Sequence, residues 1–407
     1  MLGSIGTLYR QAYSGLPRRA WILFTVNLIN ASGTMVIFFL SLYLTRRLAF
    51  SPARAGQALS LYGVGSLGGA YFGGYLSDRL GSIAVQKISL AVSGALLIVL
   101  GQVREPWAIF SLLFFLALAA GALYPANSTT MSHIVPAEIQ VKGFALSRLA
   151  NNLGATIGPA LGGFLALRDY RLLFWGDGLT SLAAAAVFSV LWKGPRHGAP
   201  ARVASVAPAA GSPGSRSPWR DTPFLLLNLI FIVWSSIFIQ VLTTFPLYIR
   251  NVYGLPENQI GQLLAVNTIL IVVLEMILME KTRKYSQTRI INLSFIMLGV
   301  GLGLMPLGRG FAFGAFTVAV WTFGEILSMP LVTALIAGRA DEATRGRYMG
   351  IFSFGFSLAF IIAPAGGMAI YSRFGGDVLW IGCAAVSFLL AGAFSLLRPY
   401  LIQRKNV

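Results

Sequence analysis

The stretch KGPRHGAPARVASVAPAAGSPGSRSPWRD, residues 193–221, divides the chain into two parts of similar length. It is rich in Pro, Gly, Ser and Ala, carries five Lys or Arg, and has no Leu, Ile, Phe or Met. A segment of this composition buries too little apolar surface to offset the entropy lost on folding. We therefore predict a flexible basic cytoplasmic linker over 193–221, between an N-terminal half, 1–192, and a C-terminal half, 222–407.

The two halves are related by an internal duplication. A constant shift of 205 residues aligns five separate places without a gap. One offset that holds at five places is hard to obtain by chance, and it indicates two structurally equivalent halves. The aligned places are Leu42-Tyr43-Leu44 with Leu247-Tyr248-Ile249, Gly56-Gln57 with Gly261-Gln262, Tyr124-Pro125 with Met329-Pro330, Lys142 with Arg347, and Pro159 with Pro364.

Composition indicates which solvent surrounds the chain. With 56% apolar and only 11% charged residues among 407, it is too apolar for a protein whose whole surface faces water. Apolar runs of about 18 residues or more are the length of a membrane-spanning helix, and the short alternating segments of a membrane barrel are absent. We expect an all-α polytopic membrane protein with twelve transmembrane helices in two pseudo-symmetric six-helix halves. The runs lie near 21–45, 55–77, 83–103, 106–132, 143–166, 172–192, 223–249, 258–279, 290–308, 311–337, 347–372 and 376–397.

Basic residues fall mainly on one side of this predicted topology. With a cytoplasmic N-terminus, the cytoplasmic segments hold 21 of the 31 Lys and Arg, the opposite loops hold nine, and Arg148 lies within a helix. Because basic residues are enriched in cytoplasmic loops, both termini and the linker are expected inside, in a multi-pass protein of the cell (inner) membrane. Topology and anionic lipid then account for the net charge of +18, and no nucleic-acid partner is expected.

The loop between the second and third predicted spans reads Gly74-Tyr75-Leu76-Ser77-Asp78-Arg79-Leu80-Gly81. It resembles the signature loop of the major facilitator superfamily, G-x-L-x-D-R-x-G. The resemblance covers essentially the whole chain, because the twelve spans, the related halves and the central linker agree with it. It implies the major facilitator fold and a gating motif that consists of Gly74, Asp78, Arg79 and Gly81.

The charges of this motif suit a gate. An Asp at a helix end can bind the N-terminus of a neighbouring helix in one state and lose that partner in the other. The alternative interpretation is that Asp78 and Arg79 only end the span at the lipid headgroups.

The fifth predicted span contains Gly154-Ala155-Thr156-Ile157-Gly158-Pro159-Ala160-Leu161-Gly162-Gly163. This resembles the G-x-x-x-G-P-x-x-G-G motif of the drug:proton antiporters of the superfamily. Glycines at this spacing leave one helix face without side chains, so that another helix can approach closely, and the proline permits a bend. We interpret Gly154, Gly158, Pro159, Gly162 and Gly163 as a helix-packing motif, with an influence on transport direction as the alternative.

Few charges lie inside the predicted spans. Each is a candidate for function, because a charge at bilayer depth costs about 2.5–3.5 kcal/mol on insertion scales. Glu325 is the deepest acid, and it resembles an acid in the tenth span of proton-coupled multidrug exporters that takes part in protonation. Glu275, in the eighth span, either lines a cavity or makes a structural hydrogen bond. The arginine that drug antiporters usually carry in the fourth span is Ala117 here, so we predict Glu325 and Glu275 as the proton-coupling residues.

Arg148 and Asn152 lie on one face of the fifth predicted span. They are candidates for the substrate cavity, where Arg148 would pair with a buried Glu or with an anionic substrate group. The alternative is that the Arg148 side chain reaches the cytoplasmic surface by snorkelling. Asp177, near the start of the sixth span, is interpreted as an interfacial charge.

Aromatic and amide residues supply the other cavity candidates. In the superfamily that the chain resembles, spans one, four, seven and ten line the central cavity. Few fixed charges beside much aromatic surface suit a lipophilic or cationic substrate better than a sugar, whose hydroxyls need many polar partners. The candidates on these spans are Asn27, Asn30, Tyr124, Asn127, Trp234, Phe238, Gln240 and Trp321.

Together these features predict a secondary active transporter that works by alternating access, exporting amphiphilic or drug-like compounds with proton coupling. The sequence has no nucleotide-binding loop of the form G-x-x-x-x-G-K-S/T, so the energy is expected to come from an ion gradient. Two alternatives on the same fold are a proton-coupled symporter or uniporter of small organic acids or other metabolites, and a lipid or lysolipid flippase.

An enzyme is disfavoured, because the sequence shows no nucleophile and base pair and no metal-ligand cluster, and Cys383 is its only cysteine. We expect no catalytic residue, no metal and no cofactor. The expected partners are a small-molecule substrate, protons and membrane lipid, and the chain is expected to act as a monomer.

Overall fold

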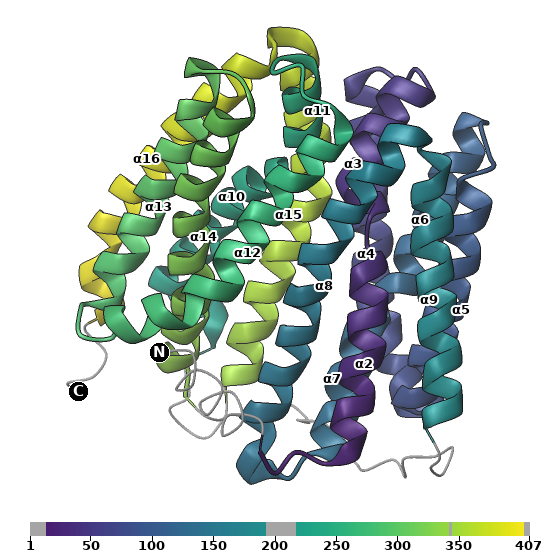
Figure 1. The fold of residues 1–407 in the computed structure, drawn as a ribbon. Helices are drawn as coiled ribbons and strands as arrows, with labels where there is room; N and C mark the ends of the chain where they lie inside the picture. The colour runs from purple at the N-terminus through teal and green to yellow at the C-terminus, as the bar shows by residue number, and fades with distance from the viewer. Residues whose placement is uncertain (1–13, 193–216, 342–343, 403–407) are drawn as a thin grey trace, which may run out of the picture. The chain divides into compact units, whose positions relative to one another are not determined.

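The computed structural model describes residues 14–192, 217–341 and 344–402, and within these ranges the chain is almost entirely helical (Figure 1). No β-strand occurs in these ranges. The all-α class predicted from the sequence is therefore confirmed.

The first half begins with an interrupted helix. Predicted span one consists of α2 (Arg18–Gly33), α3 (Val36–Leu42) and one π-helical turn, η1 (Tyr43–Arg47). The other elements of this half are α4 (Pro52–Leu80), α5 (Ser82–Leu100), α6 (Pro106–Gly121), α7 (Leu123–Ile134), η2 (Ala137–Ile139), α8 (Gln140–Arg168) and α9 (Arg171–Leu191).

The second half follows a similar order. Predicted span seven is divided into α10 and α11 at Thr244, with Pro246 in the first turn of α11, because proline has no backbone N–H with which to continue the preceding helix. The elements are η3 (Pro218–Arg220), α10 (Thr222–Thr243), α11 (Phe245–Asn251), α12 (Glu257–Thr282), α13 (Gln287–Leu304), η4 (Met305–Leu307), α14 (Phe311–Arg339), α15 (Arg345–Phe374) and α16 (Gly376–Ile402).

Ten helical stretches in the described part of the chain are long and apolar enough to cross a membrane. They coincide with all the predicted spans except the second and the fifth, which form α4 and α8. These two helices are 29 residues each and thus long enough to cross, but α8 carries Lys142 and Arg148, and α4 is rich in Gly and Ser. The prediction of a polytopic membrane protein is confirmed, and the count of twelve spans remains a prediction at α4 and α8.

The described residues form two compact units. Unit 1 contains those up to Val36 and those from Leu61 to the end of α9. There α2 packs against α8 and α9, and α5 packs against α9 and α6. Unit 2 contains Ile37–Ser60 and the described residues from 217 onward; α13 packs against α14 and α16, and α10 packs against α15. The division into halves at 192 and 222 remains a prediction, because 193–216 lie outside the described residues.

The last residues of the predicted linker, 217–221, belong to unit 2 and are partly buried. Pro218 and Asp221 are buried. Asp221 is also the N-cap of α10, because its Oδ1 accepts a hydrogen bond from the amide of Phe224 at 3.3 Å. The chain therefore enters the second half through a fixed helix start.

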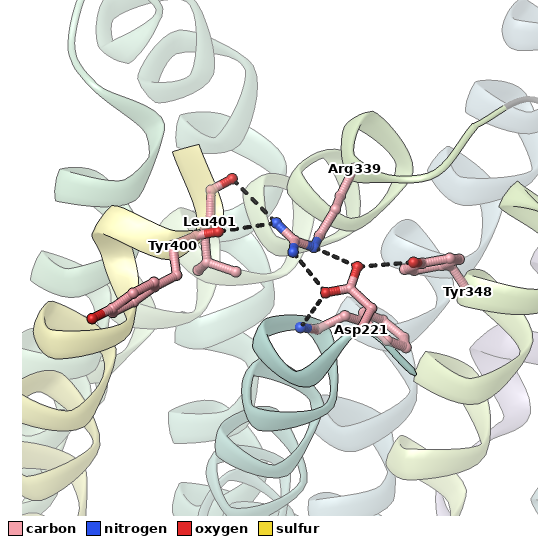
Figure 2. A network of polar contacts seen from close by, with 6 residues as sticks. Asp221, Arg339, Tyr348, Tyr400 and Leu401 are labelled. Atoms are coloured by element: carbon pink, nitrogen blue, oxygen red, sulfur yellow. Dashed lines mark hydrogen bonds and ion pairs between the residues drawn. The ribbon is translucent and has the colours of Figure 1, made fainter. Parts of the chain in front are cut away.

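Figure 2 shows the polar network that surrounds this cap. Asp221 pairs with Arg339 in two bonds, Nη2 to Oδ1 at 2.6 Å and Nε to Oδ2 at 2.8 Å. The hydroxyl of Tyr348 donates to Oδ2 at 2.8 Å, and Nη1 of Arg339 donates to the carbonyl oxygens of Tyr400 at 3.3 Å and Leu401 at 3.5 Å. One buried network thus ties together the ends of α10, α14, α15 and α16.

Candidate functional site

Glu325 lies midway along α14. Its Oε2 accepts a hydrogen bond from Nδ2 of Asn267, on α12, at 2.8 Å. The same amide group donates to Oγ1 of Thr322 at 3.0 Å, and that hydroxyl donates to the carbonyl of Val318 at 2.6 Å. We call Glu325, Asn267 and Thr322 the Glu325 cluster, in which one amide group inside unit 2 donates both to the carboxylate and to a hydroxyl.

The Glu325 carboxylate is held by neutral groups. Among the described residues no Lys, Arg or His forms an ion pair with it. The side chain is half-buried, whereas Thr322 on the preceding turn is fully buried. A carboxyl group in this position can gain or lose a proton without breaking an ion pair, which is the property that a proton-coupling residue needs.

Four aromatic rings lead to the Glu325 cluster. Phe231 stacks on Trp234 with centroids 5.0 Å apart, and Trp234 stacks on Phe238 at 5.4 Å with an interplanar angle of 4°. Phe238 meets Trp321 edge to face at 6.5 Å, and Trp321 is one helical turn before Glu325. We call these rings the aromatic ladder; Trp234 and Trp321 are buried, and Phe238 is half-buried.

Several predicted cavity residues carry a buried polar atom that has no hydrogen-bond partner among the described residues. In unit 2 these atoms are Nε1 of Trp234 and Nε1 of Trp321. In unit 1 they are Nδ2 of Asn27 and Oδ1 of Asn127. A buried polar group without a partner costs about 1–3 kcal/mol, so each of these atoms would gain from a water molecule or a bound ligand.

Two other predicted cavity residues are used in helix packing. Gln240 is buried, donates to the carbonyl of Ala363 on α15 at 2.7 Å and accepts from Thr244 at 2.6 Å. Oδ1 of Asn30 accepts from the hydroxyl of Ser181 on α9 at 3.2 Å. These hydrogen bonds show that the side-chain amides of Gln240 and Asn30 join neighbouring helices. Their role in a substrate cavity remains a prediction.

The remaining candidates differ in exposure. Arg148 is exposed on α8, Asn152 is half-buried on the next turn, and Glu275 is half-buried on α12. Tyr124 is 76% exposed at the start of α7. Among the predicted site residues, Glu325, Trp234, Phe238 and Trp321 thus lie in one continuous arrangement within unit 2.

The predicted gating motif occupies the end of α4 and the turn into α5. Gly81 has φ +87°, in the left-handed region that favours glycine, which explains the residue at this turn. Asp78 and Arg79 are exposed, and the Arg79 guanidinium lies 4.6 Å from the ring centroid of Tyr75. Asp78 makes no hydrogen bond or ion pair within the described ranges. A Cβ on Gly74 would meet no atom within 4 Å.

The predicted helix-packing motif lies where α8 crosses α2. A Cβ on Gly154 would overlap Ala31, and a Cβ on Gly158 would lie 2.7 Å from the carbonyl oxygen of Thr34. Pro159, Gly162 and Gly163 are buried on the same helix. The close approach that these glycines allow is present in unit 1, and a further effect on transport remains a prediction.

A sequence profile of the Major Facilitator Superfamily matches residues 22–364. The chain belongs to the Major Facilitator Superfamily. It is therefore a membrane transporter and not an enzyme, in agreement with the sequence-based prediction.

Several transporters are similar to this chain over nearly its whole length. The Na(+), Li(+), K(+)/H(+) antiporter of Planococcus maritimus is 24% identical over 93% of this chain and 95% of its own. Multidrug resistance protein MdtH of Enterobacter sp. (strain 638) is 24% identical over 91% of each chain. A crystal structure of peptide transporter POT in complex with sulfate has a TM-score of 0.80 at 16% identity and covers 96% of each chain. Nucleoside transporter NupG has a TM-score of 0.78 at 14% identity, over 94% of this chain and 99% of that one.

The sequence did not predict some of the polar residues that hydrogen-bond to the candidate side chains or to the backbone. Asn267 and Thr322 were not predicted, although an Asn inside an apolar helix is a signal that could have found Asn267. Asp177 was interpreted as an interfacial charge, but its side chain is buried inside unit 1, and its carboxylate binds backbone amides. Nothing in the local sequence marks Asp221 and Arg339 as partners.

Proposed function

We propose that this chain is a secondary active transporter that exports amphiphilic or drug-like compounds by alternating access in exchange for protons. The observation that carries the proposal is the Glu325 cluster, which stands one helical turn from the aromatic ladder. The ladder supplies planar apolar surface for a lipophilic substrate, and the carboxylate supplies the site for a proton or for a cationic substrate group. The names of two relatives, a multidrug resistance protein and a cation/proton antiporter, support the same function.

In this mechanism Glu325 alternates between the acid and the carboxylate. As the carboxylate it accepts the hydrogen bond from Asn267 and attracts a cationic substrate. A proton taken from outside neutralises it and weakens that attraction, and the loss of the proton to the cytoplasm restores the charged form. Because substrate and proton favour different states of one group, their movements are coupled.

The proposed setting is the cell (inner) membrane, with both termini and the basic linker in the cytoplasm and a monomer as the working unit. The excess of Lys and Arg on one side of the predicted topology supports this orientation, with anionic lipid against the basic loops. Asp78, at the end of α4, is proposed to act on the equilibrium between inward-facing and outward-facing states.

The deciding experiment uses purified protein in liposomes with an imposed pH gradient and ethidium as the planar cationic probe. Glu325→Gln keeps the shape of the protonated acid but cannot release a proton. It is expected to reduce gradient-driven ethidium accumulation about tenfold or more, and to hold ethidium affinity at the weaker, pH-independent value of the protonated acid. Glu280→Gln is the matched control, because Glu280 is an exposed acid at the end of α12. Wild-type accumulation by Glu325→Gln would refute the proposed coupling.

A second candidate function is exchange of an alkali cation for protons. The Glu325 cluster offers carboxylate and hydroxyl oxygens, and hard cations are bound by such oxygen ligands. The relative from Planococcus maritimus bears the name of such an exchanger. The candidate is tested in the same liposomes without drug: a Na⁺ or Li⁺ pulse that moves protons in wild type and not in Glu325→Gln supports it. Proton movement that requires ethidium supports drug export instead.

A further inference from the structure

The first membrane helix is broken between Gly33 and Val36. Thr34, in the gap between α2 and α3, has φ −66° and ψ 81°, which is not helical. A break of this kind leaves the first amide groups of the following helix without carbonyl partners. Inside a membrane there is no bulk water to bind them, so each such group costs several kcal/mol unless the protein supplies an acceptor.

Asp177, on α9, supplies that acceptor. Its Oδ2 accepts hydrogen bonds from the amide of Met35 and from the amide of Val36, both at 3.2 Å. The Asp177 side chain is buried, as are Met35 and Val36. A residue 142 positions away along the chain thus does for α3 what an N-cap residue does from within its own helix.

The break is also enclosed by its neighbours on two sides. A Cβ on Gly33 would overlap the hydroxyl of Thr180, one turn after Asp177 on α9. On the other side, a Cβ on Gly158 would lie 2.7 Å from the carbonyl oxygen of Thr34. The helix-packing motif of α8 and the first half of α9 therefore pack closely against the broken segment.

The internal duplication provides a comparison within the same chain. The 205-residue shift places Asp177 on Gly382, and it places Met35 and Val36 on Gln240 and Val241. At these equivalent positions α10 continues without interruption from Thr222 to Thr243. In this half, which has Gly382 in place of the acid, the break of the corresponding span lies further along, at Thr244, where Pro246 follows in the first turn of α11.

The break lies where the chain passes from one unit to the other. Unit 1 ends its first segment at Val36, and Ile37–Ser60 belong to unit 2. In unit 2 this segment is anchored by Arg46, whose Nη2 donates to Oδ1 of Asn251 at 2.7 Å, and by Ser60, whose hydroxyl oxygen accepts from the amide of Ala365 at 3.1 Å. Arg46 therefore holds the C-terminal end of the first membrane helix, and the break lies before this end.

We propose that Asp177 is a positioning residue for transport: its carboxylate caps the break at Thr34–Val36 and so makes this break a controlled hinge of the first membrane helix. A conformational change that turns α3 relative to α2 changes the backbone angles near Thr34. There the amides of Met35 and Val36 bind Asp177 and not the carbonyl groups of the preceding helical turn. The Asp177 cap keeps the freed amides satisfied while the angles change. The proposal deepens the proposed transport function, because it identifies a residue of the conformational step and not of the substrate or proton site.

The test combines hydrogen–deuterium exchange with ethidium transport for purified wild type, Asp177→Ala and Asp177→Asn. Asp177→Ala removes the oxygen that accepts both hydrogen bonds, and Asp177→Asn keeps one neutral acceptor oxygen. Exchange at the amides of Met35 and Val36 is expected to accelerate about tenfold or more in Asp177→Ala and less in Asp177→Asn. The maximal ethidium transport rate is expected to fall about tenfold in Asp177→Ala, with partial rescue in Asp177→Asn and ethidium affinity within about threefold of wild type.

Asp169→Ala is the matched control, because the Asp169 carboxylate also accepts from a backbone amide, that of Arg171 at 2.9 Å, but outside the break. It is expected to leave exchange at Met35 and Val36 unchanged. Unchanged exchange at these amides in Asp177→Ala, or in Asp177→Asn if the alanine variant does not fold, would refute the cap. Faster exchange with a wild-type maximal rate would show that the cap is structural only. A wild-type protein that moves no ethidium would contradict the proposed function, and the exchange comparison would still decide whether Asp177 holds the break.

Discussion

Removal of either partner of the Asp221–Arg339 pair should strongly destabilise unit 2. The two side chains are only 2% and 5% exposed, and their closest atoms are 2.6 Å apart. Removal of one member of a buried ion pair leaves the other charge buried without its counter-ion, which costs about 3–5 kcal/mol. We therefore expect Asp221→Asn and Arg339→Gln each to lower the free energy of unfolding by about 3–5 kcal/mol at neutral pH.

The double variant shows how much of the stability comes from the ion pair itself and how much from the other hydrogen bonds of the network. Asp221→Asn with Arg339→Gln leaves neither charge of this pair buried without its partner, so it should lose about as much stability as one single variant and not the sum of two. The difference corresponds to a coupling free energy of about 3–5 kcal/mol, the loss expected for one single variant. Unfolding of the purified protein is followed in detergent mixtures of increasing sodium dodecyl sulfate content, by circular dichroism.

An exposed ion pair in the same unit provides the control. Nη2 of Arg309 lies 3.6 Å from Oδ2 of Asp377, and these side chains are 43% and 50% exposed. Exposed pairs contribute about 0–1 kcal/mol, so Arg309→Gln should change the free energy of unfolding by no more than that. A loss below about 1 kcal/mol in the Asp221 and Arg339 variants, or an additive double variant, would refute the reasoning.

The Asp221–Arg339 pair also predicts how the free energy of unfolding depends on pH. Burial by itself raises the pKa of Asp221, but the hydrogen bonds from Arg339 and Tyr348, the charge of Arg339 and the Phe224 amide outweigh burial and hold this pKa below its ordinary value. A carboxyl group with a lowered folded-state pKa contributes stability above its unfolded-state pKa of about 3.9, and that contribution is lost as the pH falls through the lowered pKa. The stability difference between wild type and Asp221→Asn should therefore be constant from about pH 5 to 8 and shrink below about pH 4.

Two further predictions concern the gate and the linker. Asp78→Asn should slow ethidium transport in liposomes while ethidium affinity, measured by thermal shift, stays near wild type, because Asp78 acts on the equilibrium between states and does not touch the ligand; a wild-type rate would mean that the motif only ends α4. Deletion of several residues within 203–215 should leave folding and transport intact, because the composition of this segment is that of a flexible tether; loss of the folded protein in size-exclusion chromatography would show that the segment docks on the halves.

The sequence alone determined the class of the protein and its general plan. Apolar runs of membrane-spanning length predict helices without reference to their neighbours, because in lipid a helix satisfies its own backbone. The signature around Asp78 and the 205-residue repeat indicated the superfamily, whose profile matches residues 22–364. The depth of Glu325 in an apolar segment was also readable, because it depends only on distance along one helix.

Only the tertiary structure decided which polar groups meet. Asn267 and Glu325 are 58 residues apart, Arg339 and Asp221 are 118 apart, and Asp177 and Met35 are 142 apart. These contacts depend on which faces of separate helices pack together, and helical periodicity does not specify the partner of a face. For the same reason Asp177 looked interfacial from its position in one span, whereas the fold places its carboxylate on the broken backbone of another.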